Sequence, residues 1–359
     1  MKNDNQLIEF LADRGNGLSP LLILMHDYPD PDSMASALAL SYLCREKFQI
    51  KTKIVYGGII SSLDNRDMVR ELKIPAHKLK ISDLSRYRNV ALVDTQPAFE
   101  NNSFPKDRKA AIIIDQHIPV SAPQADLSLI DEKRGATCEI LAEAIISLNN
   151  EIPENLATAL AYGILTDTMN LSAVHSRKTF DIYGTIFGFC NIKTLSSLQN
   201  TKRPALFFFN MRKTIDEAQI CGRLIFCHLE NIEDPVYTAH SANFLLTYKK
   251  ADWALCTGRY NGRLYVSLRS IKQDVSAGDI LRSIFPKNVL AGGHGNIAGG
   301  SIELGDAISE DEWKNREDGM ASRLIKKLRI KSSRGITSAF QGGSALAPIK
   351  NRRGDDEEK

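Results

Sequence analysis

Three apolar runs that each end in acidic or imidazole side chains constrain the fold of this chain more than any other feature. They cover residues 21–25, 89–95 and 110–117. Each run is long enough for one buried strand, and helix-prone stretches separate the runs. Continuous β-branched runs of this kind predict a parallel sheet covered by helices on both faces. We therefore expect an α/β fold whose N-terminal part is a doubly wound, mainly parallel sheet.

The polar residues that follow these runs form a candidate site. They are His26, Asp30, Asp32, Asp94, Asp115, Gln116 and His117. The loops at the carboxyl ends of parallel strands are where α/β proteins place their sites, so these side chains are expected to converge. Asp167 is expected to join them from the end of a predicted helix over residues 154–168, where the helix dipole disfavours a carboxylate.

The stretch from His26 to Ser33 allows two interpretations when it is taken alone. In one, imidazole and carboxylate ligands between a strand and a helix bind a divalent metal. In the other, Asp32 or Ser33 caps a helix that begins near residue 34, and His26 and Asp30 are polar loop residues. The arrival of three further acidic positions at the same edge of the sheet favours the metal site.

The chemistry of such a site follows from its charge. Four or five carboxylates crowded together repel one another unless cations neutralise them. Two divalent ions about 3.5–4 Å apart are the usual solution, and this arrangement activates water for attack on a phosphoryl group. Mixed nitrogen and oxygen ligands favour Mn²⁺, with Mg²⁺ or Co²⁺ as substitutes. Asp94 is the expected bridging ligand, and His117 is expected to protonate the leaving oxygen or to bind the phosphate.

The second half of the chain has a different pattern. Short strands are expected near residues 222–228, 253–259 and 263–269, and Asn261-Gly262 predicts a hairpin between the last two. A helix near residues 277–285 precedes a glycine-rich stretch over residues 291–300, which we expect to be a turn whose N–H groups can hold an anion. A last helix is expected over residues 310–328.

Length and composition indicate a two-domain soluble protein. The chain has 359 residues, which suggests two domains. We expect a catalytic domain at 1–192, a linker at 193–215, a substrate-binding domain at 216–330 and a disordered tail at 331–359. The net charge of +3 is mild, and the six cysteines include no CxxC pair. No run approaches the roughly 18 apolar residues of a membrane span, and the N-terminus lacks a signal peptide. A cytoplasmic protein without membrane contact is expected.

These motifs together resemble those of the DHH phosphoesterase family. In chain order the four matching motifs are His26-x3-Asp30-x-Asp32, Asp94, Asp115-Gln116-His117 and Thr166-Asp167-Thr168. The second half resembles the DHH-associated domain of the RecJ and nano-RNase group. Its two signatures match Val266-Ser267-Leu268-Arg269-Ser270 and Gly292-Gly293-His294 through Ala298-Gly299. The resemblance covers roughly residues 18–305, and the order and spacing of the motifs make it specific.

The resemblance implies a two-metal phosphodiesterase in two lobes, the second a smaller α/β domain with a mixed sheet, with the active site in the cleft between them. The implied metal ligands are His26, Asp30, Asp32, Asp94, Gln116 and Asp167, and the implied catalytic residues are Asp94, Asp115 and His117. The implied substrate-binding residues are Ser267, Arg269, Gly292, Gly293, His294 and Gly295. The planar guanidinium of arginine suits phosphate, which it can meet with two hydrogen bonds. If these two residues do not bind substrate, Arg269 is an outward residue on a strand and His294 is a loop histidine.

The third motif departs from the family at Gln116. The usual motif is Asp-His-His, and its middle histidine is generally a ligand of the second metal. A glutamine oxygen is a weaker, neutral ligand. Either Gln116 still coordinates and favours Mg²⁺, or the second site fills only with substrate present, or the protein has become a nucleotide-binding regulator. We favour an active enzyme with an altered second site.

The resemblance also suggests a substrate class. The two-lobe form is similar to the stand-alone nano-RNases, which cut short RNA or DNA oligonucleotides and linear dinucleotides such as pApA or pGpG, and often the 3′-phosphate of pAp. A cyclic-dinucleotide phosphodiesterase is an alternative, and pyrophosphatases and exopolyphosphatases rank lower because their second lobe differs. The resemblance allows a homodimer.

Overall fold

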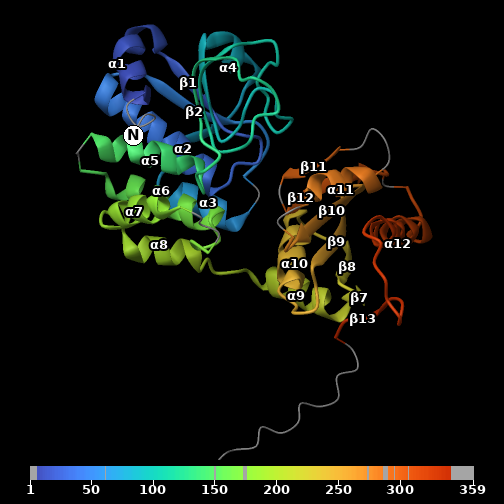
Figure 1. The fold of residues 1–359 in the computed structure, drawn as a ribbon. Helices are drawn as coiled ribbons and strands as arrows, with labels where there is room; N and C mark the ends of the chain where they lie inside the picture. The colour runs from blue at the N-terminus through green and yellow to red at the C-terminus, as the bar shows by residue number, and fades with distance from the viewer. Residues whose placement is uncertain are drawn as a thin grey trace, which may run out of the picture. The chain divides into compact units, whose positions relative to one another are not determined.

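The computed structural model describes residues 6–60, 62–148, 151–172, 176–272, 275–285, 290–294, 296–305 and 307–340. The chain divides into two units, Met1–Lys202 and Arg203–Lys359 (Figure 1). Among the described residues, no helix has both the length and the apolar character that a membrane crossing needs.

The first unit is built on a six-stranded sheet in which every pairing is parallel. Its strands are β1 (Leu21–Leu24), β2 (Thr52–Tyr56), β3 (Ala76–Lys78), β4 (Asn89–Val93), β5 (Ala110–Asp115) and β6 (Ala125–Ile130). The strand order is β3-β2-β1-β4-β5-β6, so the direction of winding reverses between β1 and β4. This confirms the doubly wound α/β fold. In such sheets the ligand site lies at the carboxyl ends of the strands where the order reverses.

Helices cover both faces of this sheet. They are α1 (Gln6–Leu18), α2 (Pro31–Tyr42), the π-helix η1 (Leu43–Lys47), α3 (Leu63–Glu71), α4 (Ile81–Arg86), α5 (Thr137–Ser147), α6 (Glu154–Asp167), α7 (Arg177–Phe187) and α8 (Ile192–Gln199). Successive side chains of a strand point to opposite faces. Leu21 and Ile23 of β1 therefore belong to the core formed with α2, α5 and α6, whereas Leu22 and Leu24 pack on the opposite face.

Helix α2 begins three residues earlier than we expected. Pro31 occupies its first position, where the missing N–H of proline costs nothing. Asp30 caps the helix, because its Oδ1 accepts a hydrogen bond from the Ser33 amide at 2.9 Å. The Ser33 hydroxyl accepts one from the Asp30 amide at 3.0 Å in return. The capping residue is thus Asp30 rather than Asp32 or Ser33.

Small residues let α6 lie close to α2 and α5. A Cβ atom added at Gly163 would lie 3.0 Å from Cys138 Sγ on α5 and 3.1 Å from Ala35 Cβ on α2. A side chain there would require the neighbouring atoms to shift by a few tenths of an ångström, because protein interiors are close-packed. The close approach fixes the position of α6, and therefore of Asp167 at its last turn.

The second unit contains a seven-stranded mixed sheet. Its strands are β7 (Gln219–Cys221), β8 (Leu224–Asn231), β9 (Trp253–Tyr260), β10 (Arg263–Ser270), β11 (Leu290–His294), β12 (Ile297–Glu303) and β13 (Thr337–Ser338). The strand order is β11-β12-β10-β9-β8-β7-β13. Only the β8–β9 pairing is parallel among those described. The helices are α9 (Ala205–Asp216), α10 (Val236–Leu246), α11 (Ala277–Ile284) and α12 (Glu310–Lys327).

The hairpin between β9 and β10 is confirmed. Asn261 and Gly262 form its turn with φ values of 47° and 68°. Both central residues of a type I′ turn need positive φ, which asparagine and glycine adopt most readily.

Three expectations for the second half need correction. The expected linker at 193–215 has regular structure, because most of it lies in α8 and α9, and Pro204 is the N-cap of α9. Phe208 and Phe209 of α9 are 62% and 66% exposed. Because apolar residues lie on the exposed side of this helix as well, its sequence shows no clear apolar stripe. The glycine-rich stretch forms most of β11 and β12 rather than a turn. Residues 331–340 of the expected tail are described and include β13, whereas residues 341–359 lie outside the described part.

Candidate metal centre

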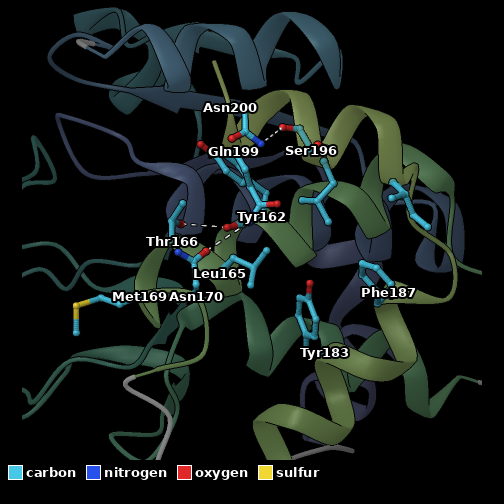
Figure 2. A pocket seen from close by; sticks show the side chains of 12 residues that line it. Tyr162, Leu165, Thr166, Met169, Asn170, Tyr183, Phe187, Ser196, Gln199 and Asn200 are labelled. Atoms are coloured by element: carbon cyan, nitrogen blue, oxygen red, sulfur yellow. Dashed lines mark hydrogen bonds between the residues drawn. The ribbon is translucent and has the colours of Figure 1, made fainter. Parts of the chain in front are cut away.

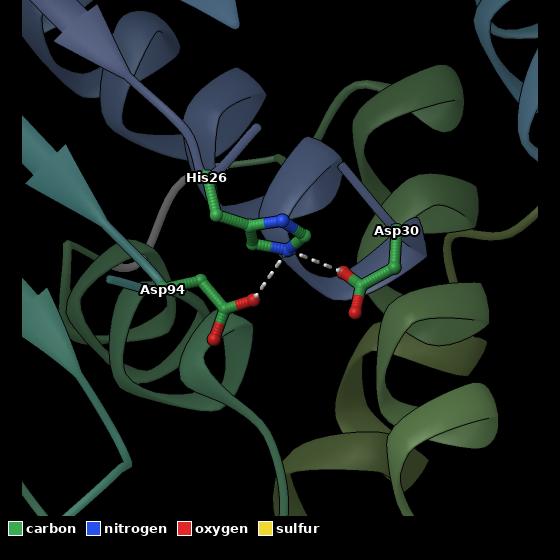
Figure 3. A group of neighbouring side chains, drawn as sticks. All are labelled: His26, Asp30 and Asp94. Carbon is green, nitrogen blue, oxygen red and sulfur yellow. Dashed lines mark ion pairs between the residues drawn. The ribbon is translucent and has the colours of Figure 1, made fainter. Parts of the chain in front are cut away.

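His26, Asp30 and Asp94 come together at the carboxyl edge of the parallel sheet (Figure 3). His26 follows β1 and Asp94 follows β4, so they lie on the two sides of the point where the strand order reverses. His26 Nε2 lies 3.7 Å from Asp30 Oδ1 and 3.5 Å from Asp94 Oδ2. One atom from each of the three residues can therefore face a common ion.

The backbone of Asp94 adopts a left-handed conformation with a φ of 56°. This conformation is unfavourable for a residue with a side chain and persists where the surrounding structure enforces it, often at active sites. Its amide still donates to the carbonyl of Ile114 in β5 at 3.0 Å. The Thr137 hydroxyl donates to Asp94 Oδ1 at 2.8 Å. The carboxylate is thus held from the strand side and from the start of α5.

Asp115 and His117, which follow β5, form a second group around Asp94. His117 Nδ1 lies 2.8 Å from Asp115 Oδ1 and 3.6 Å from Asp94 Oδ1. The Gln96 amide donates to the other oxygen of Asp115 at 2.8 Å. Asp115 is fully buried, so its two oxygens are committed to these partners. Asp94 belongs to both groups of ligand atoms.

The charges of the two groups are strongly coupled. Burial would lower the pKa of His26, but the hydrogen bonds and charges of Asp30 and Asp94 raise it to about 10. Burial would likewise lower the pKa of His117, but its hydrogen bond to Asp115 and the charge of Asp94 raise it to about 9. Both imidazoles are therefore protonated at neutral pH in the metal-free protein.

The carboxylates respond in opposite directions. Desolvation would raise the pKa of Asp30, but the hydrogen bond and charge of His26 lower it to about 2. Desolvation raises the pKa of Asp32, Asp94 and Asp167, and repulsion among the carboxylates adds to the shift. Carboxylates with raised pKa values around a shared space are stabilised by a cation that enters it.

Asp32 points toward the start of α5. Its two oxygens accept hydrogen bonds from the amides of Thr137 and Cys138, both at 2.7 Å, and the residue is fully buried. The N-terminus of a helix carries free N–H groups and a partial positive charge, which suits a carboxylate. Asp32 and the group of His26, Asp30 and Asp94 therefore have different neighbours.

Gln116 and Asp167 form a pair of their own. The Gln116 amide donates from Nε2 to Asp167 Oδ2 at 2.6 Å. This orientation pairs the N–H donor of Gln116 with an acceptor oxygen of Asp167. The structure thus brings every expected metal ligand to this edge of the sheet, but it divides them between these separate contacts.

The residues present suit a small divalent cation at the first group. One imidazole nitrogen and two carboxylates, with all ligand atoms within 4.8 Å of one another, are a ligand set that Mn²⁺ and Mg²⁺ accept. His26, Asp30 and Asp94 are the residues that would hold it.

Comparison with known proteins identifies the first unit. Residues 20–164 match the DHH family, N-terminal domain. The first unit therefore contains a match to the N-terminal domain of the DHH phosphoesterase family. Enzymes of this family are metal-dependent phosphoesterases.

Two relatives and one solved structure extend this result. The chain is 28% identical to the protein MJ1633 of Methanocaldococcus jannaschii over 87% of its length, and spans 65% of that protein. It is 24% identical to the A-adding tRNA nucleotidyltransferase of Aquifex aeolicus over 93% of its length, and spans 41% of that protein. An exopolyphosphatase-related protein from Bacteroides fragilis matches 91% of this chain and 98% of its own, with a TM-score of 0.68 and 13% identity. At that identity the likeness is one of fold.

The residues expected to bind substrate lie outside the matched DHH domain, in the second unit. Ser267 and Arg269 are on β10 and Gly292 is on β11. Gly293 and His294 end β11, but the description does not extend to their side chains, and Gly295 lies outside the described residues. Their role stays a prediction.

Two residues that support the DHH domain's centre were missed in the sequence. The Thr137 hydroxyl donates to Asp94 and also accepts a hydrogen bond from the backbone N–H of Gln116 at 3.3 Å. Gln96 donates to Asp115 and to the His117 carbonyl, at 2.8 and 2.9 Å. Thr137 is the first residue of α5 and Gln96 lies three residues after the end of β4. Neither residue type is a common metal ligand, so the sequence alone gives no signal for them.

A cavity of about 650 Å³ lies between α6, α7 and α8, beside the last turn of α6 (Figure 2). Tyr162, Tyr183 and Phe187 supply aromatic rings to its lining, and Thr166 and Asn170 supply polar groups. None of the described residues that line it is charged. A lining of this kind offers no cationic side chain to a phosphate group.

The protonated state of His26 predicts that metal binding depends on pH. A bound ion must displace the proton that His26 carries below its pKa of about 10, so the apparent affinity for Mn²⁺ should rise as pH rises. Between pH 6 and 8 the rise should approach about tenfold per pH unit, with about one proton released per ion. Isothermal titration calorimetry in two buffers of different ionisation enthalpy measures both quantities. An affinity independent of pH would contradict this account of His26.

Proposed function

We propose that this chain is a divalent-metal-dependent phosphodiesterase that hydrolyses short oligonucleotides or linear dinucleotides to mononucleotides. The observation that carries the proposal is the position of Asp94. It lies at the reversal of strand order, between His26 and Asp30 on one side and Asp115 and His117 on the other. Cation ligands and a proton donor thus face the same carboxylate.

The bound ion would withdraw charge from a phosphoryl oxygen and make water a better nucleophile. The residues of the chain account for the remaining tasks. His26, Asp30 and Asp94 hold the ion, and the Thr137 hydroxyl fixes the orientation of Asp94. Gln96 and Asp115 orient the His117 ring.

His117 is suited to act as the general acid. As the water oxygen bonds to phosphorus and the bond from phosphorus to the leaving oxygen breaks, the leaving oxygen needs a proton. His117 carries one at neutral pH, because its pKa is raised to about 9, and solvent takes the proton that the water loses. A positioned acid of this kind contributes roughly 10²–10⁴-fold to the rate.

Arg269 supports a phosphate-containing substrate. Its guanidinium donates to Asn243 Oδ1 at 2.7 Å and to the carbonyls of Leu268 and Ala298 at 2.9 and 3.1 Å. All three partners are neutral, and burial lowers the pKa of Arg269 to about 10. No carboxylate within the described residues pairs with it, so this cation favours an anionic ligand.

A panel assay tests the proposal. Purified protein is incubated with pGpG, pApA, a five-nucleotide RNA, pAp, a cyclic dinucleotide and tripolyphosphate, each with Mn²⁺, Mg²⁺ or Co²⁺. We expect release of mononucleotides from the linear dinucleotides and the short RNA, fastest with Mn²⁺, and none after metal removal with a chelator. Phosphate release from pAp would extend the activity to a 3′-phosphatase.

The rival function is a nucleotide-binding protein that lost catalysis at Gln116. It predicts saturable binding of the same nucleotides, measured by calorimetry, without turnover under any of the three metals. Cleavage of the cyclic dinucleotide in preference to the linear ones would instead favour a cyclic-dinucleotide phosphodiesterase. Hydrolysis of tripolyphosphate alone would overturn the nucleotide assignment.

A further inference from the structure

The contacts of Asp32, Gln116 and Asp167 bear on how many metal ions the centre holds. The family resemblance assigns these three residues to a second ion. In the structure each of them is engaged with a protein group instead. The number of ions follows from contacts within the first unit. It rests on the proposed function only because that function requires a cation at His26, Asp30 and Asp94.

The N-terminus of α5 already satisfies Asp32. Two amide N–H groups meet its two oxygens at 2.7 Å each, and the Ser36 hydroxyl lies 3.5 Å from Oδ1. Hydrogen bonds from donors to an ionised acceptor are roughly twice as strong as neutral ones. Both oxygens of Asp32 therefore have hydrogen-bond donors in the protein without a cation.

Gln116 supplies a donor where a metal site needs an acceptor. Its Nε2 donates a hydrogen bond to Asp167 Oδ2 at 2.6 Å, so this carboxylate oxygen faces an amide hydrogen of Gln116. A histidine at this position would present a nitrogen lone pair to an ion. Glutamine presents an N–H to the carboxylate itself.

The remaining ligand atoms gather in only two groups among the described residues. One is His26, Asp30 and Asp94, and the other is Asp94, Asp115 and His117. In the second group, the imidazole nitrogen is hydrogen-bonded to Asp115 at 2.8 Å. Neither group includes Asp32 or Asp167.

We infer that this chain holds one divalent ion per DHH domain, at His26, Asp30 and Asp94, and that the Gln116–Asp167 hydrogen bond takes the place of the second ion. The amides at the N-terminus of α5 bind Asp32, which the resemblance assigns to the same second ion. The family's two-metal centre thereby becomes a single-metal centre that keeps the ligands of the first ion.

The number of bound ions tests this inference. Protein saturated with Mn²⁺ is separated from free metal by gel filtration, and its manganese content is measured by inductively coupled plasma mass spectrometry. We expect one ion per chain in the unaltered protein and two in Gln116→His, with the spectrum of a spin-coupled Mn²⁺ pair by electron paramagnetic resonance only in the variant. Two ions in the unaltered protein would overturn the inference.

A second variant keeps the test independent of how Gln116→His folds. Asp167→Asn removes a ligand of the second ion but, under the inference, no ligand of the first. It should retain one ion per chain with the affinity of the unaltered protein, whereas His26→Asn should retain none. Loss of an ion from Asp167→Asn, or a single ion in a folded Gln116→His protein, would show that Gln116 does not decide the count.

Failure of this inference and failure of the proposed function are distinguishable. A protein that binds two ions and cleaves dinucleotides refutes the single-metal centre and leaves the function standing. A protein that binds one ion and cleaves nothing in the panel refutes the proposed function and leaves the single-metal centre standing.

Discussion

Replacing Asp94 with asparagine is expected to abolish hydrolysis and to weaken Mn²⁺ binding by more than about 100-fold. Loss of groups that merely support metal ligands costs 10–100-fold in affinity, and Asp94 is expected to be a ligand itself. The variant keeps the size of the side chain and an oxygen for the Thr137 hydroxyl, which donates at 2.8 Å. It loses the negative charge that faces both His26 and His117. Calorimetry measures the affinity, and dinucleotide hydrolysis measures the activity.

The control for this variant is Asp181→Asn, an equivalent change on the exposed surface of α7. It should bind metal and cleave dinucleotides as the unaltered protein does. The pKa of Asp94 is raised by burial first, so the ionised carboxylate does not stabilise the metal-free fold at neutral pH. The melting temperature of metal-free Asp94→Asn should therefore not fall. Full activity in Asp94→Asn would remove Asp94 from the centre of the mechanism.

Replacing Glu317 with alanine is expected to lower the free energy of unfolding of the second unit by about 3–5 kcal/mol. Arg259 is 3% exposed, and its Nε and Nη2 donate to the two oxygens of Glu317 at 3.0 and 2.6 Å. Glu310 accepts from Nη1 at 2.7 Å, and the Trp313 ring lies 5.4 Å from the guanidinium carbon. Removing Glu317 leaves most of a buried guanidinium without its acceptors.

Tryptophan fluorescence during urea unfolding measures this change selectively. The chain has two tryptophans, and both Trp253 and Trp313 lie in the second unit. The matched control is Glu303→Ala, since Glu303 is 77% exposed and pairs with Arg263 at 2.7 Å. Such an exposed pair contributes about 1 kcal/mol or less. Equal effects of the two substitutions would contradict the view that burial of Arg259 makes the difference.

The sheet of the first unit could be predicted because its strands are buried on both faces. Continuous apolar runs mark β1, β4 and β5, and the residues that end these runs predict a candidate site at one edge of the sheet. The division of labour among those residues could not be predicted in the same way. Whether Asp32 faces an ion or the start of α5 depends on how two helices dock, and no local pattern records that.

Elements without a strong periodic pattern were missed for a similar reason. Strand β3 has three residues and includes His77, and β6 alternates too weakly to predict a buried strand. Helix α9 exposes Phe208 and Phe209, which hides its amphipathic stripe. Pairing partners far along the chain decide such segments, as when β13 joins β7.

The contacts that α5 makes with Asp32 have a consequence for metal exchange. They join positions 105 and 106 residues apart in the chain and do not require an ion to be present. Together with the pair formed by Gln116 and Asp167, they keep the edge of the sheet assembled in the apoprotein. We therefore expect that an ion bound at His26, Asp30 and Asp94 would exchange without refolding of the polypeptide around it.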